Sequence, residues 1–146
     1  TNCLLTNNIA SESGHGGYGG GLYATNGVVI LEHSGVNSNF AKKYGGGIYI
    51  SASNGSIIKS SSINRNTLSD AYGGDQGGVA LYIDESENCK INNVDLQNNI
   101  FSSYLQSFVN FGGAIKVNSC NYRNIYYPNK ISAYFVREEK KLDLRL

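Results

Sequence analysis

The chain lacks methionine and tryptophan and has a single proline, Pro128. Because no initiator methionine is present and residues 1–10 match only the back half of a repeat, we expect a processed chain or an excerpt of a longer array. Pro128 cannot donate a backbone hydrogen bond, which strands tolerate only at an edge or a bend. We therefore expect the repeats to end near it.

Charge excess and long apolar runs are also missing. The formal net charge is +1, which leaves no electrostatic footprint for nucleic acid or an anionic membrane. No apolar run approaches the roughly 18 to 20 residues that span a bilayer, so we expect no membrane insertion. Three cysteines form an odd set without zinc-like spacing, so neither a metal site nor a cofactor is expected.

Glycine is abundant, with 18 residues, and it marks a motif that returns along the chain. A glycine turn followed by an apolar residue occupies residues 19–24, 45–50, 78–83 and 112–117. A second motif, small-x-apolar-x-x-Asn, ends at asparagines that lie 31, 27 and 33 residues apart: Asn8, Asn39, Asn66 and Asn99. Variable spacing between fixed motifs indicates a repeat architecture whose loops differ in length.

Both motifs favour β-structure. Apolar residues alternate at period 2 after each glycine turn, as in Ile48 and Ile50, and a third short apolar segment lies between the motifs. Three short strands per repeat, stacked at about 4.8 Å, predict an all-β parallel β-helix of about five coils over residues 1–131. The expected core rows are Leu22, Ile48, Leu81 and Ile115; Leu31, Ile58, Ile91 and Tyr122; and Leu5, Val36, Ile63, Leu96 and Tyr127.

The repeated asparagines and the rest of the chain have simpler interpretations. We expect Asn8, Asn39, Asn66 and Asn99 to stack as a structural ladder of side-chain amides at one corner. Polar and aromatic insertions at residues 69–76 and 102–111 are expected to form loops, where function concentrates. Seven of the last ten residues are charged, so residues 132–146 are predicted to be a C-terminal cap or the start of another segment.

The two motifs together resemble the GGA(I/L/V) and FxxN repeats of the polymorphic outer membrane proteins. Residues 112–115, Gly-Gly-Ala-Ile, match the first motif, whereas Leu5, Val36, Ile63 and Leu96 stand where the second motif has Phe. The resemblance implies a right-handed, pectin-lyase-like β-helix and an adhesive or structural protein outside the cell or at its surface. It implies no catalytic residues that carry over to this chain.

A row of tyrosines is the candidate binding site. If Leu22, Ile48 and Leu81 point inward, then Tyr23, Tyr49, Tyr82 and Lys116 point outward in register. Their neighbours Gly21, Gly47, Ala80 and Ala114 are small, which predicts a shallow floor beside the phenol rings. Such a surface could bind a glycan or a protein partner, and the alternative is that the rings only stabilise neighbouring strands.

No catalytic site can be assigned. The enzymes on this fold act through clustered carboxylates and cations, and the candidates here are Asp70, Asp75, Asp84 and Asp95 with Lys59, Arg65 and Lys90. Asp70 and Asp75 share a glycine-rich loop, which favours solvated loop charges. His15 and His33 have no evident Ser or Cys partner.

Cys89 and Cys120 occupy equivalent positions of adjacent coils. The sequence therefore leaves two alternatives, which are a disulfide between them and a buried row of free thiols. Asn54 begins the one N-glycosylation sequon. Taken together, we expect a non-catalytic protein for adhesion or scaffolding, whose partner is a glycan, a protein surface or another copy of the chain. The alternatives are a polysaccharide-active lyase or hydrolase and a filament-forming subunit, since open solenoid ends invite strand addition.

Overall fold

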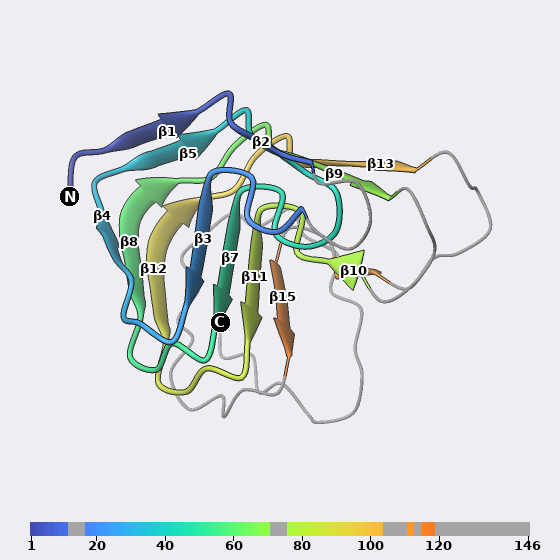
Figure 1. The fold of residues 1–146 in the computed structure, drawn as a ribbon. Helices are drawn as coiled ribbons and strands as arrows, with labels where there is room; N and C mark the ends of the chain where they lie inside the picture. The colour runs from blue at the N-terminus through green and yellow to red at the C-terminus, as the bar shows by residue number, and fades with distance from the viewer. Residues whose placement is uncertain (12–16, 71–75, 104–110, 113–114, 119–146) are drawn as a thin grey trace.

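The computed structural model describes residues 1–11, 17–70, 76–103, 111–112 and 115–118, and within them every regular element is a β-strand (Figure 1). All pairings between these strands are parallel. The segment 132–146, Cys120, Tyr122 and Tyr127 lie outside the described residues. An all-β chain with parallel sheets agrees with the expected fold class at this level.

One sheet follows directly from the glycine motif. It contains β3 (Leu22–Thr25), β7 (Ile48–Ser51), β11 (Leu81–Asp84) and β15 (Ile115–Asn118), in the order in which the repeats occur. The register aligns the row Leu22, Ile48, Leu81 and Ile115. Ile48 and Leu81 are fully buried, which confirms the inward side of the predicted alternation.

A second sheet lies on the opposite side of the core from the first and continues along the top of the molecule in the view of Figure 1. It contains β1 (Leu4–Thr6), β4 (Ile30–Glu32), β5 (Gly35–Asn37), β8 (Ile57–Ser62) and β12 (Lys90–Asp95). β8 pairs with β4 through its first half and with β5 at its end. The second and third predicted strand pieces are therefore separate strands, β4 and β5, in one repeat. In each of the next two repeats they merge into a single strand, β8 or β12, which contains one residue with positive φ, Ser60 or Asn93.

A third sheet was not predicted. β2 (Ile9–Ala10), β6 (Phe40–Ala41), β9 (Thr67–Asp70) and β13 (Ile100–Ser103) follow the asparagine motif, and β10 (Gln76–Gly77) pairs with β14 (Phe111–Gly112) beside them. Ala41, Leu68 and Val79 make a small core of their own under this sheet. The expected set of three strand pieces per repeat thus omitted the strand that follows each asparagine.

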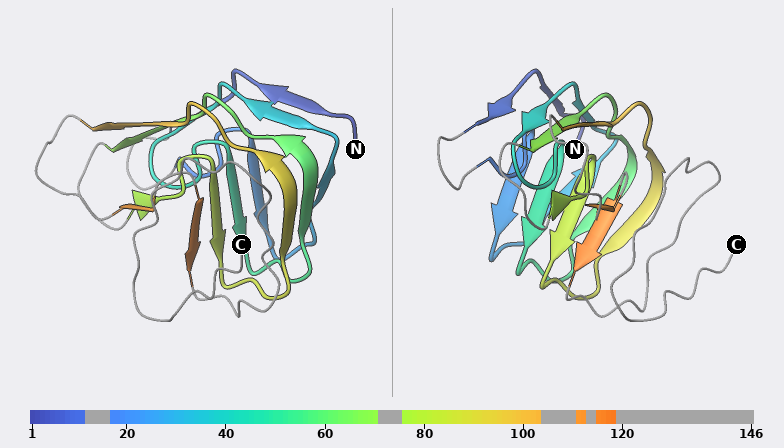
Figure 2. Two further views of the ribbon diagram at one scale, coloured as in Figure 1. Left: turned by 180° about the vertical axis from the view of Figure 1, so that it is seen from behind. Right: turned by 90° about the vertical axis from the view of Figure 1, so that its right-hand side faces the viewer.

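The main core lies between the first two sheets. It contains the predicted residues Leu31, Ile58 and Ile91 and also Val36, Ile63 and Leu96, while Leu5 and Leu22 of the first repeat pack against it partly buried. Burying an aliphatic side chain stabilises the folded chain by about 1.5 to 3 kcal/mol. Like residues stack on like, so neighbouring repeats bury one continuous core. Figure 2 shows the strands of successive repeats lying side by side around it.

The corners are marked by residues with positive φ, which also fall into rows. Among the described residues, twelve with positive φ are not glycine, and eleven of these occupy equivalent positions of successive repeats. The rows are Asn2, His33, Ser60 and Asn93; Asn7, Ser38, Arg65 and Asn98; and Asn26, Ala52 and Glu85. Because Ala, Arg and Glu adopt this conformation at a cost, stacking rather than local preference fixes the corners.

Candidate functional site

The tyrosine row is built by the register of β3, β7 and β11. Tyr23 aligns with Tyr49, Tyr49 with Tyr82, and Tyr82 with Lys116 of β15. The ring centroids of Tyr23 and Tyr49 lie 5.3 Å apart with planes 9° from parallel. Tyr49 and Tyr82 repeat this geometry at 5.3 Å and 10°. The structure therefore brings the three predicted tyrosines together as one stack, and the Lys116 side chain lies outside what it describes.

Two further tyrosines, which were not predicted from the sequence, extend the stack into a second row. Tyr18 and Tyr44 align through a parallel bridge, and their rings lie 5.4 Å apart. Tyr44 contacts the first row with its centroid 4.7 Å from that of Tyr82. Tyr18 meets Tyr49 edge to face at 5.2 Å. The signal was available, because a tyrosine stands five residues before Tyr23 and before Tyr49, with three glycines between.

A positive charge accompanies the second row. The Lys43 ammonium lies 5.7 Å from the ring centroid of Tyr18 and 5.5 Å from that of Tyr44. Both distances fall within the range of a cation–π contact, which contributes about 0.5 to 1 kcal/mol at exposed sites. We call Tyr18, Tyr23, Tyr44, Tyr49 and Tyr82, together with Lys43, the tyrosine cluster.

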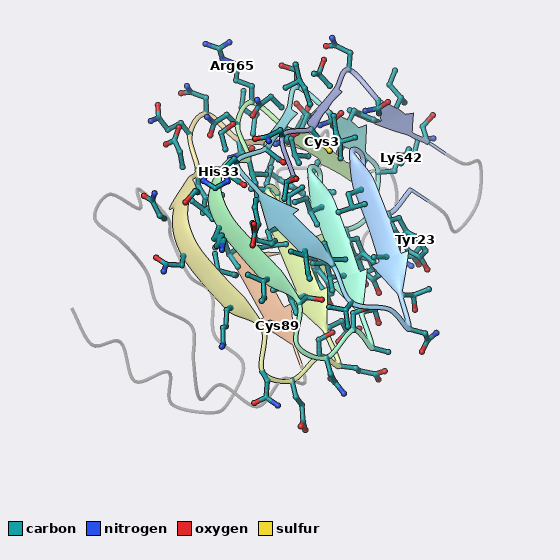
Figure 3. All side chains as sticks on the ribbon, turned by 90° about the vertical axis from the view of Figure 1, so that its left-hand side faces the viewer. Cys3, Tyr23, His33, Lys42, Arg65 and Cys89 are labelled. Carbon is teal, nitrogen blue, oxygen red and sulfur yellow. The ribbon has the colours of Figure 1, made fainter. Side chains whose placement is uncertain are left out.

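Exposure changes steeply along the first row. Tyr23 is 54% exposed and stands on the side of the molecule seen in Figure 3, Tyr49 is half-buried, and Tyr82 is only 5% exposed. Burial raises the pKa of the Tyr49 hydroxyl. A hydrogen bond with Ser51 lowers this pKa and the negative charge of Asp84 raises it, and the net shift is upward. Because stacked rings cover one another's faces, Tyr23 offers the most accessible ring surface, and the neighbouring rings offer chiefly edges.

The predicted shallow floor beside the rings is wrong. A methyl group on Gly47 would lie 2.8 Å from the Ile63 side chain and 2.9 Å from Asn66 Nδ2, so this position faces the core. Ala80, in the same row, is fully buried. The chain still turns at Gly45, whose φ is 59°, and the strand alternation begins only at Ile48. Small residues stand there because core and asparagine side chains fill the space; Ala114 lies outside the described residues.

The asparagine row lies directly beneath these small residues. Asn39 Oδ1 accepts hydrogen bonds from the backbone and side-chain nitrogens of Asn8, each at 3.0 Å. Asn66 Oδ1 accepts from Asn39 in the same way at 2.9 and 3.1 Å, and Asn99 Oδ1 accepts from Asn66 at 2.9 and 3.0 Å. Each amide thus binds the next repeat, and the row fixes the register that aligns the tyrosines.

Serines form additional rows that were not predicted. Ser34 N donates to Ser61 Oγ at 3.1 Å, and Ser61 Oγ donates to the Lys59 carbonyl at 2.7 Å. Ser53 N donates to Ser86 Oγ at 2.9 Å at another corner. The asparagine motif marks Ser34 and Ser61 only as small residues, and it does not include Ser53 and Ser86. Their hydrogen bonds follow from the corner geometry.

Cys89 belongs to such a row. The register places it opposite Ser56, its side chain is buried, and its sulfur lies 3.8 Å from the Ser53 carbonyl oxygen. Burial raises the pKa of the Cys89 thiol. Cys120 lies outside the described residues, so the disulfide between Cys89 and Cys120 stays a prediction.

The charged candidates do not gather into a catalytic arrangement among the described side chains. Lys59 Nζ binds Glu32 Oε1 at 2.9 Å, and this bond lowers the pKa of the Glu32 carboxyl. Asp95 accepts hydrogen bonds from Asn64 and Gln97, at 2.9 and 2.7 Å. Asp75 and the side chain of Asp70 are not among the described parts, whereas Arg65, Lys90 and His33 are exposed.

The described part of the chain contains neither a metal-binding cluster nor a membrane-spanning helix. No group of three or more His, Cys, Asp or Glu side chains in it could hold a metal ion. The same part of the chain contains no helix with the length and apolarity that crossing a bilayer requires.

Comparison of the chain with known proteins finds no match. Neither protein-family models, nor curated protein sequences, nor solved structures match the chain. The similarity to the polymorphic outer membrane proteins therefore rests on the short repeats alone.

Proposed function

We propose that the chain is a right-handed parallel β-helix that acts outside the cell or at its surface, without catalysis, in adhesion or as a scaffold. Each sheet takes its strands from successive repeats in parallel register, which supports a solenoid of this kind. The polymorphic outer membrane protein-like repeats support the handedness and the location.

The tyrosine cluster is the proposed contact surface for a glycan or a protein. One observation carries this assignment. Five phenol rings and the Lys43 ammonium lie together over the sheet of β3, β7, β11 and β15, and Tyr23 among them is 54% exposed. Tyrosine presents an apolar ring and a polar hydroxyl at low entropic cost, so it is enriched at binding surfaces. A sugar ring or an apolar side chain would stack on the accessible ring of Tyr23, and the hydroxyl edges would supply hydrogen bonds.

Binding to a broad glycan array, with product formation assayed on every hit, tests this proposal. We expect Tyr23→Ala to lower affinity about tenfold or more, since losing an anchoring ring at an interface costs at least about 1.4 kcal/mol. Tyr23→Phe separates ring stacking from hydrogen bonding by the hydroxyl. Ile30→Ala is the matched control, because Ile30 is equally exposed on the outer surface of another sheet.

The outcomes separate the alternatives. Binding that depends on Tyr23 without turnover supports an adhesive module, and turnover would instead support the polysaccharide-active enzyme. If no glycan binds and no protein partner is captured in a Tyr23-dependent way, the cluster has only a structural role. An equal loss in the Ile30 variant would also contradict the assignment.

A further inference from the structure

Two Asn-Gly pairs lie in the same connection of consecutive repeats, the second pair two positions further along in register. Asn26-Gly27 follows β3, and Asn54-Gly55 lies in the matching connection after β7, at the lower end of the sheet in Figure 1. In an Asn-Gly pair the glycine backbone nitrogen can attack the asparagine side-chain carbonyl carbon, because glycine has no Cβ to obstruct the approach. The surroundings of the two pairs differ, so their reactivity should differ too.

The first pair is open. Asn26 and Gly27 are both exposed, and a methyl group on Gly27 would meet nothing nearer than the Thr25 carbonyl oxygen at 4.0 Å. The Gly27 nitrogen makes one long hydrogen bond, to Ser53 Oγ at 3.3 Å. The Asn26 amide donates to the exposed Thr25 hydroxyl at 3.2 Å. Neither atom that must react is held by a short bond.

The second pair is held by the following repeat. The Gly55 nitrogen donates to the Glu87 carbonyl oxygen at 2.8 Å. Asn54 Oδ1 accepts from the Glu87 nitrogen at 2.7 Å. Attack requires the Gly55 hydrogen bond to break, because this nitrogen is the nucleophile and must lose its proton. The bond from Glu87 to Oδ1 restrains the Asn54 side chain, so this side chain is not free to turn its carbonyl carbon toward the nitrogen.

We propose that Asn26 is a site of spontaneous deamidation in the folded protein and that Asn54 is protected by its contacts with Glu87. A bond forms between the Gly27 nitrogen and Asn26 Cγ, the Cγ–Nδ2 bond breaks, and ammonia leaves with the proton of the Gly27 amide. Water then opens the cyclic imide and leaves a carboxylate at position 26, joined through either the normal or the β-carbonyl. No oxidant, reductant or metal takes part.

The modification would alter the corner that terminates β3. It adds a negative charge, and the β-linked product lengthens the main chain at a residue whose φ is 56°. β3 lies at the edge of its sheet among the described strands, and it carries Tyr23. We therefore expect the modified form to have a looser edge strand.

The test is incubation of the full chain at mildly alkaline pH, folded and in urea, with conversion at each asparagine followed by peptide mass spectrometry. In the folded protein Asn26 should convert at least about fivefold faster than Asn54, because breaking even one hydrogen bond of about 1 kcal/mol slows the reaction by that factor. In urea the two rates should converge. Gly27→Ala should slow conversion at Asn26 at least about tenfold and leave Asn54 unchanged, since the position has room for a methyl group and the added Cβ only obstructs the attack.

Three results would overturn the proposal. The first is conversion of Asn54 as fast as Asn26 in the folded chain. The second is a ratio that urea does not change, which would assign the difference to local sequence. The third is no conversion of Asn26 in the folded chain while the unfolded chain converts.

Discussion

Single residues in this molecule matter chiefly through the rows to which they belong. Asn66 shows this best, because its fully buried side chain joins three repeats. Its Oδ1 accepts from Asn39, and its Nδ2 donates to the Val36 carbonyl at 2.8 Å and to Asn99 Oδ1 at 3.0 Å. Losing such a group leaves buried polar atoms on both sides without partners.

Asn66→Ala should therefore lower the free energy of unfolding by about 2 to 4 kcal/mol, measured by urea denaturation. Asn64→Ala is the control on the outer side of the same repeat. Asn64 also accepts a bond, from the Gln97 nitrogen at 2.7 Å, but it is only partly buried. We expect this variant to lose about 1 kcal/mol or less. Equal losses would show that the inner row has no special role.

Residue-level prediction from sequence succeeded where a residue type recurs and failed where only a position recurs. The asparagines were visible because the same amide serves every repeat. The left-handed corner Asn26, Ala52 and Glu85 was not visible, because its three side chains share no chemistry. Stacking of the main chain imposes that conformation, and a single sequence does not display it.

Among the elements, the sheet of β3, β7 and β11 was the most predictable, since its alternation and register follow from the glycine motif. The sheet of β2, β6, β9 and β13 was the least predictable. Its first two strands, Ile9–Ala10 and Phe40–Ala41, are two residues long and too short to show any period. The inward turn of Gly47 was missed for a related reason, because alternation was extended into a corner that precedes the strand.

The same sheet gives a prediction about pH. Burial raises the Tyr49 pKa above its ordinary value of 10.0 in the folded chain. The folded state therefore holds this proton more tightly than the unfolded state does, and its contribution to stability is present below pH 10 and is lost as pH rises through the folded pKa. The urea concentration at the unfolding midpoint should therefore decrease as the pH is raised above 10.

Tyr49→Phe is the control for that titration, because it keeps the stacked ring and removes the ionisable hydroxyl. The decline of the urea midpoint with pH should be shallower in this variant than in the parent. Cys89, whose pKa burial also raises, contributes in the same direction in both proteins. Identical pH profiles would contradict a perturbed Tyr49.

At the scale of the whole molecule, stability should be highest in the middle of the described stack. β7 pairs with β3 on one side and β11 on the other, whereas β1 and β2 each have one partner among the described strands. In a stack held by nearest neighbours, opening proceeds from the ends. Hydrogen exchange should be slowest in β7, β8 and β11 and fastest in β1 and β2. Uniform protection across these strands would indicate a single cooperative unit instead.

Much of the overall architecture could be predicted because the same sequence pattern occurs in several repeats. The aligned rows Leu31, Ile58 and Ile91 reflect this directly. The tyrosine cluster was only half visible, because Tyr18 and Tyr44 join it across the glycine turn, and such a contact depends on how the turn folds.

The tyrosine cluster also has an optical consequence. The chain has no tryptophan, so its ultraviolet fluorescence comes from its 11 tyrosines, and five of them lie with neighbouring ring centroids 4.7 to 6.2 Å apart. Excitation of one ring at such distances passes readily to the next. The emission and the near-ultraviolet circular dichroism of this protein therefore report the alignment of successive repeats without any added label.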